Sequence, residues 1–192
     1  MVLVSLPPFL PRKWLSSVAT CIGLTSSCCF AQPIFFAVES TPYDNQMVRV
    51  RPVLESLCDE SAGQTSLVSV NQLMIKLRGL RYRYSKQWKT PAEVTATGVA
   101  DCKGKAITLY EQMQAIGAQN IRFVIGKRRA GSGETHAWLE WETREGQYLL
   151  DPTFNWLAVK ALPRSSNKYI PLYVYEGPFR YHAVNVTGIA QN

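Results

Sequence analysis

The fold is decided by residues 98–117, which read GVADCKGKAITLYEQMQAIG. The apolar side chains recur at helical spacing from Ala106 to Ile116, and a glycine follows as a helix stop signal. Asp101 stands where the N-cap of such a helix belongs. The sequence therefore predicts an amphipathic helix that begins at Cys102 and carries this cysteine in its first turn.

Cys102 has local surroundings that suit a nucleophile. The unpaired N–H groups and the positive dipole end of a helix N-terminus favour a thiolate, and Lys103 and Lys105 would add positive charge. Small residues nearby would let a substrate backbone approach the sulfur; these residues are Gly98, Ala100 and Gly104. The alternative is a buried cysteine that acts as a small hydrophobic side chain, which is the commoner role of an isolated cysteine.

A predicted hairpin brings a histidine and an acid to one face of a sheet. Residues 136–142 (HAWLEWE) and 147–151 (QYLLD) have the composition of strands, and residues 143–146 (TREG) make a turn between them. With this turn, or with a two-residue turn, Asp151 lies diagonally across from His136 and within side-chain reach. A loop of odd length would place the two residues on opposite faces.

Cys102, His136 and Asp151 together are a candidate catalytic triad. An acid beside an imidazole holds its tautomer and stabilises the imidazolium, and the imidazole in turn takes the proton of the cysteine. Spacing alone does not bring the helix end to the hairpin, so their meeting in space is an expectation. His182, the other histidine of the chain, has no comparable acid nearby and is read as structural or surface.

The remaining pattern predicts an α+β domain with N-terminal helices packed on an antiparallel sheet. Helices are expected over residues 52–57, 67–77 and 91–97, and strands over 80–84, 121–126, 170–176 and 178–186. At 192 residues the chain is long enough for one domain with a sizeable core.

The first 31 residues have the layout of a secretory signal peptide. Arg12 and Lys13 precede a small, apolar run that ends at Ala31, and no acid occurs before Glu39. The predicted organisation is a signal peptide over 1–31, a leader segment over 32–45 and the domain over 46–192. The protein is expected to be exported, periplasmic or secreted, and an uncleaved N-terminal anchor is the alternative.

Loss of residues 1–31 would leave two of the five cysteines, Cys58 and Cys102. An exported protein with two cysteines can join them in a disulfide. A catalytic Cys102 must stay free, so a disulfide between these residues would contradict the catalytic interpretation.

Charge and motif content narrow the choice of partners. The net charge of +7 becomes +5 when Arg12 and Lys13 are removed. The basic, aromatic stretch 78–89 could indicate nucleic-acid binding, but a solvated strand with its apolar side chains facing inward is favoured. An exported protein meets anionic cell-surface polymers more often than nucleic acid, so such a polymer is the expected anionic partner. No CxxC or HxxxH spacing, carboxylate cluster or phosphate-binding glycine loop occurs, so no metal and no cofactor is expected. No membrane contact is expected beyond the signal segment. The GSG stretch at 131–133 is read as a loop near a substrate cleft.

Three blocks of the sequence resemble the transglutaminase-like superfamily. They are the cysteine block over 98–126, ETHAWLEWE over 134–142 and YLLDPTF over 148–154, in this order. The resemblance implies a papain-like cysteine-protease fold with Cys102 as nucleophile, His136 as base and Asp151 as orienting acid. It also implies an upstream oxyanion donor beside the backbone N–H of Cys102, with Gln87 or Trp88 as candidates.

Such a site would act on peptide or side-chain amide bonds. Thiolate attack and protonation of the leaving amine by His136 give an acyl-enzyme, which water or a lysine amine then resolves. The short exported form resembles bacterial transglutaminase-like cysteine peptidases, so a cysteine peptidase with a protein or peptide substrate is favoured. A protein-glutamine transglutaminase or deamidase is one alternative, and a catalytically silent peptide-binding module of the same fold is another.

Overall fold

A seven-stranded antiparallel sheet organises the described part of the chain, which in this computed structural model covers residues 33–56, 65–161 and 168–184. Its strands are β1 (Ile34–Ala37), β4 (Ile121–Arg129), β5 (His136–Thr143), β6 (Gly146–Leu150), β7 (Val159–Lys160), β8 (Lys168–Glu176) and β9 (Phe179–Val184). They lie in the order β1-β9-β8-β4-β5-β6-β7. The short strands β2 (Arg81–Tyr82) and β3 (Val99–Ala100) form a separate parallel pair.

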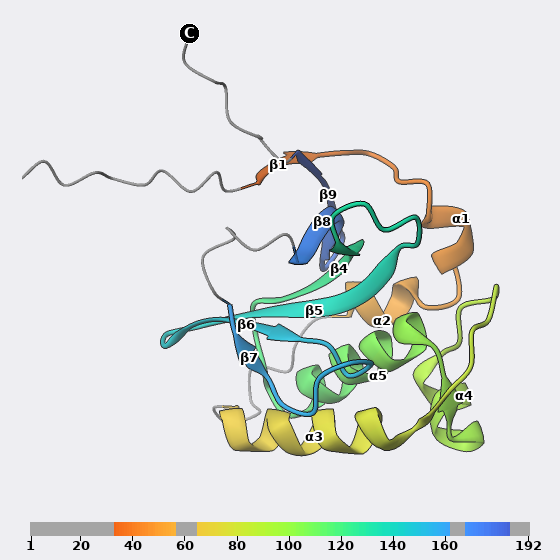
Figure 1. Cartoon of the computed structure of the whole chain (residues 1–192), viewed down its shortest axis with the longest axis vertical. Helices are drawn as coiled ribbons and strands as arrows, with labels where there is room; N and C mark the ends of the chain where they lie inside the picture. Colours follow the sequence, from red (N-terminus) through yellow and green to blue (C-terminus); the bar gives the residue numbers. More distant parts are fainter. Residues whose placement is uncertain (1–32, 57–64, 162–167, 185–192) are drawn as a thin grey trace, which may run out of the picture.

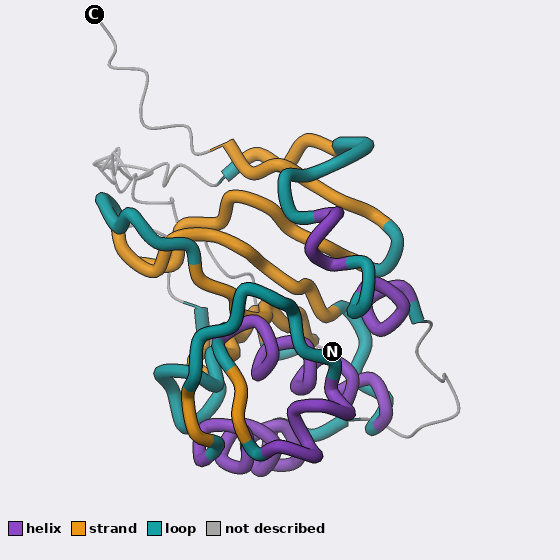
Figure 2. Tube along the Cα trace, turned by 90° about the vertical axis from the view of Figure 1, so that its right-hand side faces the viewer, coloured by secondary structure: helices purple, strands orange, loops and turns teal. Residues whose placement is uncertain are grey.

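The helices gather on one side of this sheet. They are α1 (Asp44–Met47), α2 (Arg51–Glu55), α3 (Leu67–Gly79), α4 (Pro91–Thr97) and α5 (Cys102–Ala115). Figure 1 shows α2, α3, α4 and α5 together below β5, and in Figure 2 most of the helical turns lie below the long strands. The helix α5 packs against β4 and β5 on one side and against α2, α3 and α4 on the others.

The central position of α5 corrects the expectation of an amphipathic helix. Its first turns are buried on nearly all sides, polar residues included. The hydroxyl of Thr108 donates to the carbonyl of Gly104, and the Lys105 ammonium donates to the carbonyls of Arg78 and Leu80. Because these polar groups are hydrogen-bonded, they can be buried without a large desolvation penalty.

Most expected elements are present with shifted ends. The helix expected over 91–97 matches α4, which has a capping box at Thr90 and Glu93 and ends at Gly98 in the left-handed conformation. The strand expected over 80–84 shrinks to the two residues of β2. The helix expected over 52–57 is α2, and Leu57 lies outside the described residues.

The segment expected to be a leader, residues 32–45, contributes an edge strand. Within it, β1 pairs with β9 in a register that places Ile34 opposite Val184. The hydroxyls of Thr41 and Tyr175 lie 2.6 Å apart and anchor the chain that follows β1 to the sheet. The predicted signal peptide, residues 1–31, lies outside the described residues, and none of the described helices is long and apolar enough to cross a membrane.

Candidate active site

Asp101 caps α5 and fixes the position of the cysteine that follows it. Its Oδ1 accepts a hydrogen bond of 3.0 Å from the backbone N–H of Gly104, as an N-cap side chain does. Its Oδ2 accepts hydrogen bonds from the backbone N–H of Ser85 and from the ammonium of Lys103. Cys102 therefore begins the helix at a rigid junction, where its backbone N–H has no partner within the helix. The thiol of Cys102 is free and 8% exposed.

The hairpin of β5 and β6 places His136 and Asp151 together as predicted. The turn has two residues, Thr143 pairs with Gly146, and the register keeps the even parity on which the prediction depended. The Nε2 atom of His136 lies 2.9 Å from Oδ2 of Asp151. Asp151 is completely buried, whereas the His136 side chain is 10% exposed.

The ring of His136 lies between the acid and the cysteine, so the structure brings all three predicted residues together. Burial lowers the pKa of His136, but hydrogen bonds to Asp151 and Cys102, together with the charges of these two residues, outweigh burial and raise the pKa to about 9. Since Nε2 faces Asp151, the other ring nitrogen is left for Cys102. The imidazole is therefore held mostly protonated at neutral pH, beside the sulfur.

Tyr169 on β8 is a part of this site that the sequence pattern did not reveal. Its hydroxyl donates a 2.8 Å hydrogen bond to the same Asp151 Oδ2 that faces His136. Burial and then the charge of Asp151 raise the pKa of Tyr169, so its hydroxyl remains a donor. Its backbone has a φ of 56°, which costs a residue other than glycine about 1 kcal/mol. A strained tyrosine thus supports the buried acid.

Aromatic rings surround the imidazole on its remaining sides. Trp138 stacks on His136 with an interplanar angle of 21° and meets Tyr169 edge-on. The ring of Phe154 lies 5.2 Å from that of His136, and the guanidinium of Arg128 lies 4.0 Å above Phe154. These contacts fix the orientation of the imidazole and limit the access of water to it.

The two lysines near Cys102 serve other groups, which corrects the expectation that both support the thiolate. The ammonium of Lys103 contacts Asp101, the carbonyl of Ser85 and the rings of Tyr84 and Trp88. Burial, followed by the charge of Arg78, lowers the pKa of Lys105, whose ammonium faces backbone carbonyls at the end of α3.

The small residues around Cys102 have packing roles rather than the expected role in substrate approach. A methyl group added at Gly104 would lie 3.2 Å from both Ala100 and Val94, so this glycine lets α5 pack closely against α4 and β3. Gly98 ends α4 with a φ of 64°.

The cleft has an upstream wall that includes one of the suggested oxyanion donors. Trp88 lines the cleft with Cys102, and its indole N–H donates weakly, at 3.4 Å, to Oε1 of Gln46. Gln87 is exposed and is not among the described residues that line the cleft. Tyr82 and Tyr84 line the cleft and are 52% and 67% exposed, whereas Trp88 is buried, so the apolar side chains of the stretch 78–89 face inward only in part.

Two adjacent cavities meet at Cys102 and His136. One, of about 430 Å³, extends past Phe154, Arg128 and Arg129. The other, of about 600 Å³, is lined by aromatic residues, which are Tyr43, Tyr82, Tyr84 and Trp88. The loop over 130–135 borders both, which places the GSG stretch at the cleft as expected.

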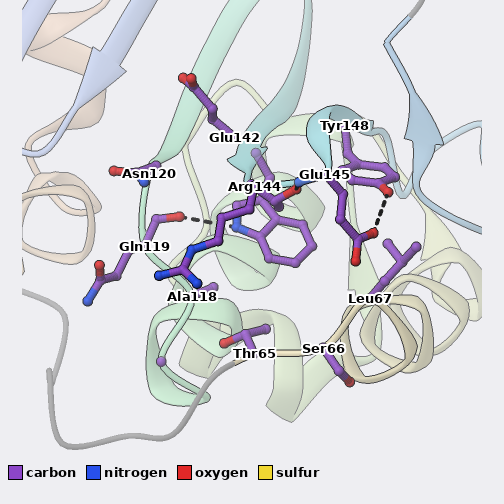
Figure 3. A pocket seen from close by; sticks show the side chains of 13 residues that line it. Thr65, Ser66, Leu67, Ala118, Gln119, Asn120, Glu142, Arg144, Glu145 and Tyr148 are labelled. Atoms are coloured by element: carbon purple, nitrogen blue, oxygen red, sulfur yellow. Dashed lines mark hydrogen bonds between the residues drawn. The ribbon is translucent and has the colours of Figure 1, made fainter. Parts of the chain in front are cut away.

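A further cavity, of about 670 Å³, lies away from these residues (Figure 3). It is bordered by the turn between β5 and β6, the end of α5 and the start of α3. Polar groups in its wall bond to each other: the indole N–H of Trp141 donates to the carbonyl of Gln119, and Tyr148 donates to Glu145. Neither Cys102 nor His136 lines it, and among the described residues no cluster of His, Cys, Asp or Glu is arranged to hold a metal ion.

Comparison with solved structures identifies this arrangement. Calcium-bound LapG from Legionella pneumophila superposes with a TM-score of 0.53 at 17% identity, over 80% of this chain and 87% of LapG. The EGTA-treated form of LapG gives a TM-score of 0.55 at 18% identity, over 78% and 82% of the two chains. LapG is a transglutaminase-like cysteine protease.

The chain has the transglutaminase-like, papain-like fold. No family model and no curated protein sequence matches the chain significantly, so the likeness lies in structure. In this transglutaminase-like fold, the expected α+β class and the expected papain-like core are both confirmed. The cysteine at the start of the central helix and the histidine at the start of β5 line the same two cavities.

Proposed function

We propose that this chain is an exported cysteine peptidase in which Cys102, His136 and Asp151 are the catalytic residues. The observation that carries the proposal is the imidazole of His136, which is hydrogen-bonded to a completely buried acid and lines the same two cavities as Cys102. The fold shared with LapG supports the same chemistry. The layout of residues 1–31 supports export.

The residues of the site supply each step of amide cleavage. The sulfur of Cys102 adds to the carbonyl carbon, and the backbone N–H at the start of α5 donates to the oxygen as it becomes negative. His136 gives a proton to the leaving amine, the C–N bond breaks, and an acyl-enzyme forms. Water then adds to the acyl carbon while His136 takes its proton, and the product acid leaves as the sulfur is released.

Asp151 and the surrounding rings keep this exchange of protons efficient. The acid holds the ring of His136 so that the nitrogen not bonded to Asp151 faces Cys102 throughout the cycle. Trp138 and Phe154 cover the ring and keep water out of the hydrogen bond between histidine and acid.

The first test measures the reactivity of the two cysteines of the mature chain. Iodoacetamide should modify Cys102 at pH 6 at least about tenfold faster than Cys58, because an ordinary thiol is protonated at this pH. His136→Ala should slow the modification of Cys102 about tenfold. The matched control is His182→Ala, since His182 packs against Tyr173 outside the cleft. Peptide mass spectrometry resolves the two sites.

Equal reactivity of Cys102 and Cys58, or an equal effect of His182→Ala, would contradict the proposal and favour a silent binding module. A second test uses a pool of quenched fluorescent peptides with and without dansylcadaverine. Cleavage without incorporation of the amine is the result expected of a peptidase. Amine incorporation in place of cleavage would instead assign the chain as a transglutaminase.

A further inference from the structure

We propose that Arg128 and Arg129 form a carboxylate-binding subsite beside Cys102, which selects substrates that carry a carboxylate next to the amide bond that is cleaved. This inference rests on the proposed amide-cleaving function and adds the chemical class of the substrate. The carboxylate belongs either to an acidic side chain or to a chain end, and the experiment below distinguishes these two sources.

The subsite lies within one side-chain layer of the reacting groups. Arg128 and Arg129 end β4 and line the 430 Å³ cavity together with Cys102 and His136. The guanidinium carbon of Arg128 lies 4.0 Å from the centre of the Phe154 ring, whose other contact is the imidazole of His136 at 5.2 Å. A substrate that reaches Cys102 through this cavity must therefore pass the two arginines.

The positive charge of the subsite is not neutralised by the protein. Among the described residues, no carboxylate lies within ion-pair distance of either Arg128 or Arg129. Glu134 is the one acidic residue in the described lining of this cavity, and it is exposed to solvent. The nearby acid, Asp151, is fully occupied by His136, Tyr169 and the backbone N–H of Thr153. The cavity is thus lined by two cationic side chains and by one anionic side chain, whose charge is screened by solvent.

Arg128 is also held in a form suited to a carboxylate. Contact with an aromatic ring engages the face of a guanidinium and leaves its N–H edge available. That edge presents paired donors that match the two oxygens of a carboxylate. Because Phe154 already restricts the side chain of Arg128, less conformational entropy is lost when a carboxylate binds.

The second cavity makes the cleft asymmetric. Tyr43, Tyr82, Tyr84 and Trp88 give it aromatic walls, and the ammonium of Lys103 is already bonded to Asp101. Lys86 is the other cation in its lining and is exposed. This side of Cys102 suits an apolar part of the substrate, so the carboxylate is assigned to the side of the arginines.

Two alkylating reagents of nearly equal size test the subsite without knowledge of the natural substrate. Iodoacetate carries a carboxylate where iodoacetamide carries a neutral amide, and both transfer their CH₂ group to the sulfur with loss of iodide. The rate of modification of Cys102 by iodoacetate, divided by its rate with iodoacetamide, should fall about threefold to fivefold in Arg128→Met. This ratio should fall further in the double variant that also carries Arg129→Met. Lys160→Met, which removes the same charge beside the β5–β6 turn, should leave the ratio unchanged.

The two rates separate the possible failures. Slow reaction of Cys102 with both reagents would contradict the proposed function itself. Fast reaction with a ratio that is equal in the wild type, Arg128→Met and Lys160→Met would overturn only the subsite. Because each ratio is taken on one protein, a general change in the reactivity of the thiolate in a folded variant cancels.

Two further probe pairs identify the source of the carboxylate. Bromoacetyl-glycine and bromoacetyl-glycinamide differ at the chain end, whereas the bromoacetyl amides of aspartate and asparagine differ in the side chain. An arginine-dependent preference for the first acid assigns a terminal carboxylate, and a preference for the second assigns an acidic side chain. Absence of a preference in both pairs would contradict the subsite.

Discussion

At the scale of single residues, the site is organised around one buried carboxylate. Asp151 accepts hydrogen bonds from His136, Tyr169 and the backbone N–H of Thr153. A carboxylate removed from water is costly unless its oxygens are hydrogen-bonded, so these partners are what allow an acid at this depth. The arrangement also transmits any change at Tyr169 to the imidazole and then to Cys102.

Tyr169→Phe should therefore weaken the site although Tyr169 does not touch the cysteine. We expect hydrolysis and Cys102 alkylation to slow about tenfold, with kcat affected more than KM. The alkaline limb of the pH–rate profile should move to higher pH, because an Asp151 with fewer donors holds the imidazolium more strongly. Tyr181→Phe is the control, since its ring packs in the same small cluster. If the alkaline limb of the pH–rate profile does not move, Tyr169 acts only through packing.

The raised pKa of His136 makes stability depend on pH. The pKa is about 9 in the folded chain against an ordinary value of 6.5, because hydrogen bonds to Asp151 and Cys102 outweigh the effect of burial. The protonated ring thus stabilises the fold fully below pH 6.5, and this contribution is lost as pH rises to 9. The free energy of unfolding, measured in urea, should fall over this range.

Asp151→Asn is the comparison that assigns this fall to His136. The variant lacks the charge that raises the pKa of the imidazole, so its stability should change less between pH 6.5 and 9. Groups that do not sense the charge of Asp151 titrate alike in both proteins and cancel in the difference. Identical slopes in the two proteins would mean that another group is responsible.

At the scale of elements, β4 and β8 approach so closely that one position must be glycine. The pairing of these strands shifts register between Ile125 and Gly126. A methyl group at Gly126 would lie 2.2 Å from the carbonyl oxygen of Ile170 and 2.6 Å from the ring of Trp138. The same tryptophan stacks on His136, so the geometry of a strand pair affects the position of the imidazole.

Gly126→Ala should destabilise the protein by about 2 kcal/mol or more and slow the alkylation of Cys102, because strand β8 and Trp138 must both shift. Gly133→Ala is a matched control, since a methyl group there meets nothing within 4 Å. Urea unfolding followed by tryptophan fluorescence measures the difference. Equal stability of the two variants would show that β8 moves away without strain.

The sequence predicted the helices and strands themselves better than the tertiary contacts that surround them. The two-residue period of β5 and β6 places His136 and Asp151 on one face because parity survives any even turn. The capping pattern locates Cys102 at the start of α5 in the same local way. The complete burial of α5 and the support of Asp151 by Tyr169 depend on elements far apart in the chain, and local periodicity carries no information about them.

At the scale of the whole molecule, the fold class is predictable but the outline of the domain is not. The order of helices before an antiparallel sheet is enough for the α+β class. The position of β8 between β9 and β4 is a matter of long-range pairing, and it decides which residues surround the site. The four-residue strand β1 has no pattern that separates it from a leader, since an edge strand needs only one partner.

A chain that begins at Gln46, the domain start expected from the sequence, should be less stable than one that begins at Gln32. It would lose β1, the hydrogen bond between Thr41 and Tyr175 and the ion pair between Asp44 and Arg180. We expect a difference of about 2 kcal/mol or more in urea unfolding. Equal stability would mean that β1 rests on the sheet without contributing to it.

The positive charge next to Cys102 comes from the side chain of Lys103, so, unlike a bound ion, it cannot dissociate from the protein. The ammonium of Lys103, held by Asp101, Ser85 and two aromatic rings, belongs to the chain by covalent bonds. LapG has been solved in calcium-bound and EGTA-treated forms, but here neither calcium nor EGTA should change the alkylation rate of Cys102. The junction at the start of α5 would then hold its charge whatever the ionic composition of the surrounding solution, and the reactivity of Cys102 would follow pH instead.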